Sequence, residues 1–207
     1  MAKILVFGSS EAWGAFDTER GGWVERLKVY YLQNRESNHY YVYNFGISGD
    51  DTGGILFRLR KQIEMLENVF HDDYIFIFSI GKNDGRYIKE KLNKQISIED
   101  YEENLKKIIS IAREYSDKIS FIGIPEIDES KTKPWNEEYQ EHYENDDLEN
   151  YDNKLMETCE KEGVNYIKIR NLLIKEDLHD GLHPNAEGHR KIFERVKEEL
   201  NKVLEIN

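Results

Sequence analysis

An aspartate and a histidine lie three positions apart near the carboxyl end of the chain, in the string Asp180-Gly181-Leu182-His183-Pro184. A neutral imidazole can take a proton from a hydroxyl group, and a neighbouring carboxylate can fix the tautomer of the ring and stabilise its charged form. Residues three apart on one loop can form this pair by local geometry alone. The string therefore predicts His183 as a base with Asp180 as its acid partner, and Pro184 fits the first turn of a following helix.

A candidate nucleophile for this base is Ser10, which follows a short apolar run near the amino end. A hydroxyl nucleophile needs a tight turn from strand to helix that exposes its oxygen, with backbone N–H groups directed at the reacting centre. Gly8 can supply the turn and Ser10 the hydroxyl. Glycine and serine also occur together in ordinary turns and in phosphate cradles, so this segment alone leaves those alternatives open.

Two further segments carry groups that could stabilise an oxyanion. Residues 46–50 contain two glycines, which suggests backbone N–H groups held close to a substrate. Asn83 follows another apolar run, and its side-chain amide can donate a hydrogen bond. Each segment also has a structural alternative, because Ser48 or Asp50 could cap the next helix and Asn83 could form an Asx turn.

Each of these segments follows a predicted β-strand. Short apolar runs predict strands that are covered on both faces, at residues 4–7, 41–45, 74–80, 119–124 and 165–169. Amphipathic patterns predict helices at residues 22–35, 53–70, 98–116, 148–162 and 186–204. The alternation predicts an α/β fold with a central parallel sheet, in which reactive residues gather at the carboxyl ends of the strands.

The four segments resemble, in the same order, the four sequence blocks of the SGNH hydrolase superfamily (GDSL-type esterases and lipases). They are residues 7–10, 46–50, 81–84 and 180–184, so the resemblance spans nearly the whole chain. It implies Ser10 as nucleophile, His183 as general base and then acid, and Asp180 as the residue that orients His183. It also implies an oxyanion hole formed by the Ser10 backbone N–H together with Gly49 and Asn83.

The resemblance further implies a flavodoxin-like three-layer α/β/α sandwich with a central five-stranded parallel sheet. The implied activity is hydrolysis of carboxylic esters through an acyl-enzyme, with carbohydrate O-deacetylation as the alternative within the family. The short chain and the polar segment at residues 125–150 favour small soluble esters over long-chain lipids. A non-catalytic flavodoxin-like ligand-binding module is the alternative outside it. No cofactor and no metal site are expected.

Two neighbours of Ser10 depart from the family pattern. The first block usually reads Gly-Asp-Ser, but Ser9 stands at its middle position here, and Glu11 follows where the family usually has an apolar residue. An anion directed into the site would oppose a developing oxyanion. We therefore expect Glu11 to face solvent or another polar partner.

The segment between residues 125 and 150 is acidic and rich in aromatic side chains. The chain has a net charge of −12, and ten acidic and two basic residues at 126–149 contribute −8 of it. We interpret the segment as a solvated surface excursion, with an acidic lid that disfavours anionic substrates as the alternative. Its aromatic residues, with one just beyond it, could pack on a helix or line the substrate pocket: Trp135, Tyr139, Tyr143 and Tyr151.

The length fits a single hydrolase domain over residues 1–207. The negative charge argues against nucleic acid and anionic membranes as partners, and no apolar run is long enough for membrane insertion or a signal peptide. A small-molecule ester is the expected partner, and the sequence is compatible with a homo-oligomer. The only cysteine, Cys159, suits the cytoplasm. The other histidines, including His179 as a rival base, are expected at the surface or in packing.

Overall fold

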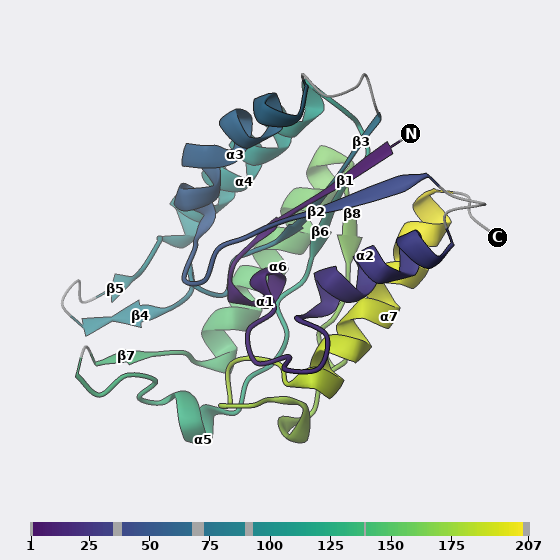
Figure 1. The fold of residues 1–207 in the computed structure, drawn as a ribbon. Helices are drawn as coiled ribbons and strands as arrows, with labels where there is room; N and C mark the ends of the chain where they lie inside the picture. The colour runs from purple at the N-terminus through teal and green to yellow at the C-terminus, as the bar shows by residue number, and fades with distance from the viewer. Residues whose placement is uncertain (1, 35–38, 68–72, 90–92, 139, 205–207) are drawn as a thin grey trace.

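The main sheet has five parallel strands in the order β2-β1-β3-β6-β8 in the computed structural model of the chain (Figure 1). The structure describes residues 2–34, 39–67, 73–89, 93–138 and 140–204. The strands are β1 (Ala2–Gly8), β2 (Tyr40–Gly46), β3 (Asp73–Ser79), β6 (Ile119–Ile122) and β8 (Asn165–Ile167). The predicted five-stranded parallel sheet is therefore confirmed, although β3, β6 and β8 each end before the predicted residue.

Helices cover both faces of the sheet and complete the three predicted layers. One face carries α2 (Trp23–Gln33) and α7 (Ala186–Val203). The other carries α3 (Thr52–Glu67), α4 (Ile98–Arg113) and α6 (Asn145–Glu162). The predicted ends of the first two helices, at residues 35 and 68–70, lie outside the described residues. Within the described ranges, no helix is both long enough and apolar enough to cross a bilayer.

The side chains of β1 alternate between two apolar clusters. Leu5 and Phe7 pack in the cluster that includes side chains of α3, α4 and α6, whereas Ile4 and Val6 pack in the one that includes side chains of α2 and α7. All four are fully buried, because successive residues of a strand point to opposite faces and both faces are covered. The unbroken apolar run in the sequence thus reflects a strand in the middle layer.

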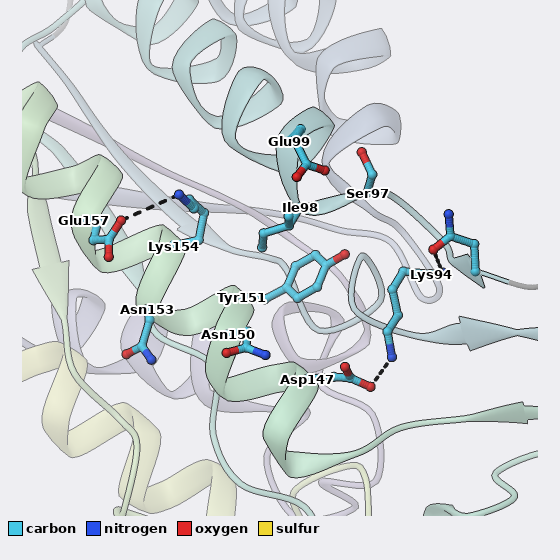
Figure 2. Close-up of a pocket in the computed structure, with 11 residues that line it drawn as sticks. Lys94, Ser97, Ile98, Glu99, Asp147, Asn150, Tyr151, Asn153, Lys154 and Glu157 are labelled. Carbon is cyan, nitrogen blue, oxygen red and sulfur yellow. Dashed lines mark hydrogen bonds and ion pairs between the residues drawn. The ribbon is translucent and has the colours of Figure 1, made fainter.

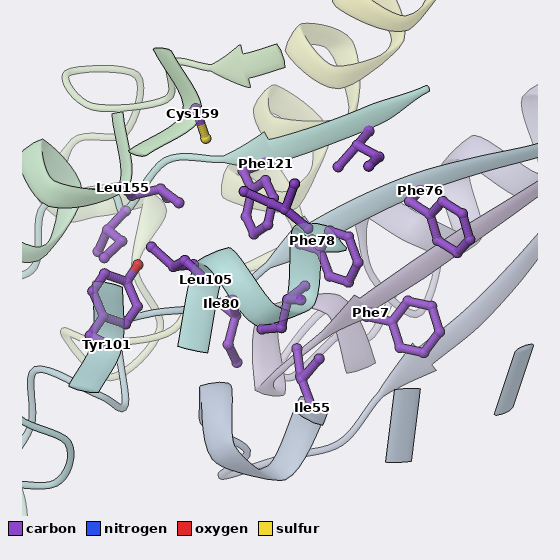
Figure 3. Close-up of a cluster of buried hydrophobic side chains, with 14 of the residues drawn as sticks. Phe7, Ile55, Phe76, Phe78, Ile80, Tyr101, Leu105, Phe121, Leu155 and Cys159 are labelled. Atoms are coloured by element: carbon purple, nitrogen blue, oxygen red, sulfur yellow. The ribbon is translucent and has the colours of Figure 1, made fainter. Parts of the chain in front are cut away.

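A row of phenylalanines crosses the sheet one residue before the strands end, and Figure 3 shows three of its members. Phe45, Phe7, Phe78 and Phe121 occupy paired positions on β2, β1, β3 and β6. Neighbouring ring centroids along this row are 5.0, 5.6 and 4.8 Å apart. Such pairs each add about 1 kcal/mol to the effect of area burial. The row therefore holds together the strand ends whose loops carry the candidate site.

The strand order reverses at β1. From β1 the chain passes through α2 to β2 on one side, and β3 then lies on the other side of β1. Loops that leave the carboxyl ends of two such strands diverge and form a crevice between them. Ser10 follows β1 and Asn83 follows β3, so both lie at this switch point.

Several short elements were not predicted from the sequence. They include α1 (Ser10–Trp13), α5 (Glu129–Thr132) and a 3-10 helix, η2 (Lys175–Asp177). A second sheet has the order β5-β4-β7, with β4 at Tyr87–Ile88, β5 at Asn93–Lys94 and β7 at Glu141–His142. Because β4 follows the Asn83 loop and β7 lies within the acidic segment, this pairing fixes the acidic segment beside the candidate site.

Candidate active site

Ser10, His183 and Asp180 form one hydrogen-bonded chain. Ser10 Oγ lies 3.0 Å from His183 Nε2, and His183 Nδ1 lies 2.8 Å from Asp180 Oδ2. A carboxylate can only accept, so Nδ1 carries the ring proton and Nε2 is free to accept the proton of the Ser10 hydroxyl. This is the arrangement that converts a weakly acidic hydroxyl into a nucleophile.

The Asp180 carboxylate is held by its own loop. Its Oδ1 accepts hydrogen bonds from the backbone N–H groups of Leu182 at 3.0 Å and His183 at 2.8 Å. Gly181 has a φ of +89°, a conformation that favours glycine in this tight turn. Burial raises the pKa of the Asp180 carboxyl, but the hydrogen bonds from His183 and Leu182 outweigh it and lower the pKa to about 2. The carboxylate is therefore charged at neutral pH.

The loop that carries Asp180 and His183 is closed at its base. The His179 N–H donates to His183 O at 2.8 Å, and Leu178 and Pro184 form an isolated antiparallel bridge. Asn185 then caps α7 with its side-chain oxygen. The prediction that Pro184 lies in the first helical turn is wrong, because the helix begins only after this cap.

Ser10 is the first residue of α1, with Ser9 as the N-cap. A backbone N–H at this position has no partner within the helix. The first bond of the helix comes later, where the Trp13 N–H donates to Ser9 O at 2.9 Å. The Ser10 N–H is therefore not used within α1, and that it donates to an oxyanion stays a prediction.

The Asn83 amide is oriented by two hydrogen bonds. Its Nδ2 donates to Asp50 O at 2.8 Å, and its Oδ1 accepts from the Tyr143 hydroxyl at 2.9 Å. Neither bond belongs to an Asx turn, so that alternative is wrong. An amide nitrogen carries two donors, and within the described part of the chain only one of them is used. Tyr143 was not predicted to act on Asn83, because 60 residues separate them.

Gly49 lies in the loop after β2 with a φ of +82°. No atom lies within 4 Å of the place where a Cβ would stand, so the backbone conformation, rather than crowding, favours glycine here. Neither Ser48 nor Asp50 caps α3, because the Asp51 side chain accepts the Gly54 N–H at 2.9 Å. That the Gly49 N–H serves an oxyanion stays a prediction.

Glu11 is buried, with 6% of its surface exposed. Of the two environments expected for it, the polar partner is the one found, since its carboxylate is ion-paired with Lys82. Lys82 is buried to the same extent and also donates to Leu182 O at 2.9 Å. Lys82 was not predicted. The sequence shows only that a lysine precedes Asn83 and that an unusual acid follows Ser10, and it gives no sign that the two side chains meet.

Two aromatic side chains flank the His183 ring. The ring centroid of Phe16 lies 5.3 Å from that of His183, and the centroid of Trp135 lies 5.6 Å from it. Phe16 also stacks on His179 at 4.3 Å, so the rival base contacts this aromatic ring while His183 holds the hydrogen bond to Ser10. Phe16 and Trp135 thus place apolar surface next to His183.

The aromatic residues of the acidic segment have separate surroundings. Trp135 and Tyr143 reach the candidate site, as described above, and neither lies in a helix. Tyr151 instead packs on Tyr101, with ring centroids 5.0 Å apart, which joins α6 to α4. Tyr139 lies outside the described residues. Packing on a helix is therefore found for Tyr151, Tyr143 is a buried core residue, and that Trp135 lines the substrate pocket stays a prediction.

Many acidic groups of this segment are ion-paired. The pairs are Glu144 with Lys133, Glu141 with Arg86, Asp147 with Lys94, Asp128 with Lys175, and both Glu126 and Glu149 with Arg170. Most of these bases come from outside the segment. The negative charge is thus partly neutralised where the segment packs on the rest of the molecule.

A cavity of about 640 Å³ lies away from the triad, between α6, the start of α4 and β5 (Figure 2). Four of its charged side chains form two ion pairs, Lys94 with Asp147 and Lys154 with Glu157. None of the residues predicted to act in catalysis lines it. The candidate active site is therefore at the switch point.

A family model described as the GDSL-like lipase/acylhydrolase family matches residues 6–191. The chain belongs to this family. It is accordingly a hydrolase of the GDSL type that acts on carboxylic esters, as the sequence blocks indicate. A comparison with curated protein sequences finds no match.

Solved structures of GDSL-type and related esterases have the same fold. A lipase/acylhydrolase from Enterococcus faecalis is 19% identical, with a TM-score of 0.75 over 98% of this chain and 96% of that one. The psychrotrophic esterase EstA from Pseudoalteromonas sp. is 19% identical, with a TM-score of 0.72 over 98% of both chains. An acetyl xylan esterase from Geobacillus stearothermophilus is 17% identical, with a TM-score of 0.71 over 95% and 93%. At these identities the comparison shows the fold.

Asp84 is a buried acid of this GDSL-type hydrolase, next to Asn83. Its Oδ1 accepts from the Thr52 N–H at 3.1 Å and from the Thr52 hydroxyl at 2.5 Å, which ties the loop after β3 to the start of α3. Burial raises the pKa of Asp84 to about 7; the hydrogen bonds from Thr52 oppose the rise, and the charge of Asp51 adds to it.

The raised pKa predicts a pH-dependent stability. Between about pH 4 and pH 7 the folded state binds a proton at Asp84 that the unfolded state has lost, so the free energy of unfolding falls as pH rises, on the order of 1 kcal/mol per pH unit. Asp84→Asn should remove this slope. Urea unfolding of both proteins at pH 5 and pH 7.5 measures it, and equal slopes for the two would contradict the prediction.

Proposed function

We propose that this chain hydrolyses carboxylic esters of small soluble substrates through an acyl-enzyme on Ser10. The observation that carries the proposal is the hydrogen-bonded chain from Ser10 through His183 to Asp180 at the switch point of the sheet. Asp180 stays ionised because its pKa is lowered to about 2, so it can stabilise a protonated His183 ring.

The proposed reaction has two matching halves. His183 Nε2 takes the hydroxyl proton while Ser10 Oγ bonds to the ester carbonyl carbon, and the carbonyl oxygen becomes an oxyanion. The backbone N–H groups of Ser10 and Gly49 and the free donor of Asn83 stabilise that charge. The carbon–oxygen bond to the alcohol then breaks as His183 gives its proton to the leaving oxygen. Water repeats the steps on the acyl-enzyme and releases the acid.

The surroundings of His183 favour an uncharged organic ester. Phe16 and Trp135 flank the ring, and Phe16 is 43% exposed, so an apolar acyl or alcohol group can contact it. Carbohydrate O-deacetylation is the second candidate, because the indole of Trp135 beside His183 is a flat surface on which a sugar ring can stack. One relative in fold is an acetyl xylan esterase.

We further propose that residues 1–207 act as a single SGNH-type hydrolase domain in the cytoplasm, with residues 125–150 as one wall of its site. The contacts of Tyr143 with Asn83 and of Trp135 with His183 support the wall. The buried and unpaired Cys159 is consistent with a reducing compartment.

Ser10→Ala should lower kcat by about 10⁴-fold or more, since the nucleophile and its base act as a unit. His183→Ala and Asp180→Asn should also lose activity while remaining folded. Hydrolysis of p-nitrophenyl esters of increasing chain length, alongside acetylated xylo-oligosaccharides, measures the rates and separates the two substrate classes. A fluorophosphonate probe should label wild type and Ser9→Ala at Ser10, and absence of labelling in the folded wild type would refute the proposal.

Tyr143→Phe should lower kcat by about tenfold with little change in KM, because the Asn83 amide loses the bond that orients it toward the oxyanion. Tyr166→Phe is the matched control. Its hydroxyl also donates to a side-chain oxygen, that of Asp152 at 2.9 Å, but this bond joins β8 to α6 and involves none of the proposed catalytic residues. Equal kcat values for the two variants would show that Tyr143 does not orient Asn83 for catalysis.

A further inference from the structure

Three loops that carry proposed catalytic residues meet at one buried ammonium group. Lys82 Nζ is ion-paired with Glu11 and donates to Leu182 O at 2.9 Å. The three segments lie far apart in sequence: Glu11 and Lys82 are 71 positions apart, and Lys82 and Leu182 are 100 positions apart. The contact between the three segments therefore depends on the fold and not on their proximity in sequence.

Each participant is the immediate neighbour of a proposed catalytic residue. Glu11 follows Ser10, Lys82 precedes Asn83, and Leu182 precedes His183. A displacement of any participant is therefore transmitted through one peptide unit to the nucleophile, the oxyanion donor or the base.

The contacts are buried as well as adjacent. The side chains of Lys82 and Glu11 are 7% and 8% exposed, and Leu182 is 2% exposed. Hydrogen bonds to charged donors are stronger than neutral ones and gain from the low dielectric of the interior. Lys82 thus holds the backbone carbonyl of Leu182, which lies in the loop between Asp180 and His183, by a strong hydrogen bond.

We propose that the Glu11–Lys82 ion pair is a positioning device that holds the Asp180–His183 loop against the Ser10 turn. Glu11 fixes the ammonium group, and the ammonium group fixes Leu182 O. The inference rests on the proposed function of Ser10 and His183. A displacement of about 1 Å between reacting groups can cost 10²-fold in rate, so loss of this anchor should lower kcat rather than raise KM.

Removal of one charge would leave the other buried and unpaired, which can unfold a protein. The test variant is therefore the double substitution Glu11→Leu with Lys82→Met, since an apolar pair of similar volume is often as stable as a buried ion pair. This double variant should melt near the wild-type temperature. Its kcat for p-nitrophenyl acetate should fall by about 10-fold to 100-fold with KM within about twofold. The single variant Lys82→Arg keeps the positive charge and the hydrogen-bond donors, so it should retain most of the wild-type kcat.

Lys3→Met is the matched control. Lys3 is 1% exposed, and its Nζ donates to a backbone carbonyl, Leu66 O at 3.0 Å, at the opposite end of β1. This variant loses a comparable buried donor and should keep its kcat even if it melts at a lower temperature.

A second readout does not depend on turnover. The His183 Nδ1 proton, which is donated to Asp180, should give a low-field proton NMR signal. The signal is assigned to this proton if His183→Ala lacks it. The double variant should lose or broaden that signal, whereas Lys3→Met should keep it. A double variant with wild-type kcat and an intact signal would overturn the positioning role. A wild type that neither turns over esters nor is labelled at Ser10 would instead refute the proposed function. In that case the NMR comparison of the double variant with Lys3→Met would still test the positioning role.

Discussion

The close approach of β1 and β3 at Gly8 sets the geometry on which the site depends. A Cβ atom at Gly8 would lie 2.5 Å from Ser79 O, so only glycine lets the two strands end side by side here. The Ser9 N–H donates to Ser79 O at 3.3 Å, and the chain turns at once into α1 with Ser10 in its first turn. On the other side of β1, the Ile47 N–H donates to Gly8 O at 3.0 Å. One small residue thus brings the loops after three strands to the same place.

The loops at this edge are held mainly by one another. Asn83 donates to Asp50 O, and Tyr143 donates to Asn83. The Asp128 N–H donates to Gly181 O at 2.8 Å, which joins the acidic segment to the loop of the base. Loops whose polar groups are satisfied by neighbouring loops have few alternative arrangements. If the Ser10, Gly49 and Asn83 donors act as we propose, they are held in place before substrate binds, which is the condition under which such donors lower a barrier most.

The parts of this site that could be predicted are those encoded locally. Asp180 and His183 are three residues apart on one loop, and Ser10 follows a strand with clear apolar character, so spacing and strand order were enough to bring them together. Tyr143 and Lys82 could not be found in this way. Their partners lie 60 to 100 residues away, and their roles exist only once the segments have packed. The strands β4, β5 and β7 were missed for a related reason, because two residues cannot show a period.

The acid beside Ser10 would be harmful if it stood alone. A buried carboxylate one residue from the nucleophile would oppose the oxyanion and would itself be costly to bury. Lys82 removes both penalties, since the buried pair has no net charge and the ammonium group still has a donor for Leu182 O. Glu11 and Lys82 are therefore each unfavourable without the other, and together they tie the Ser10 turn to the loop of Asp180 and His183. Loss of either charge alone would leave the other buried and unpaired, at a cost in stability.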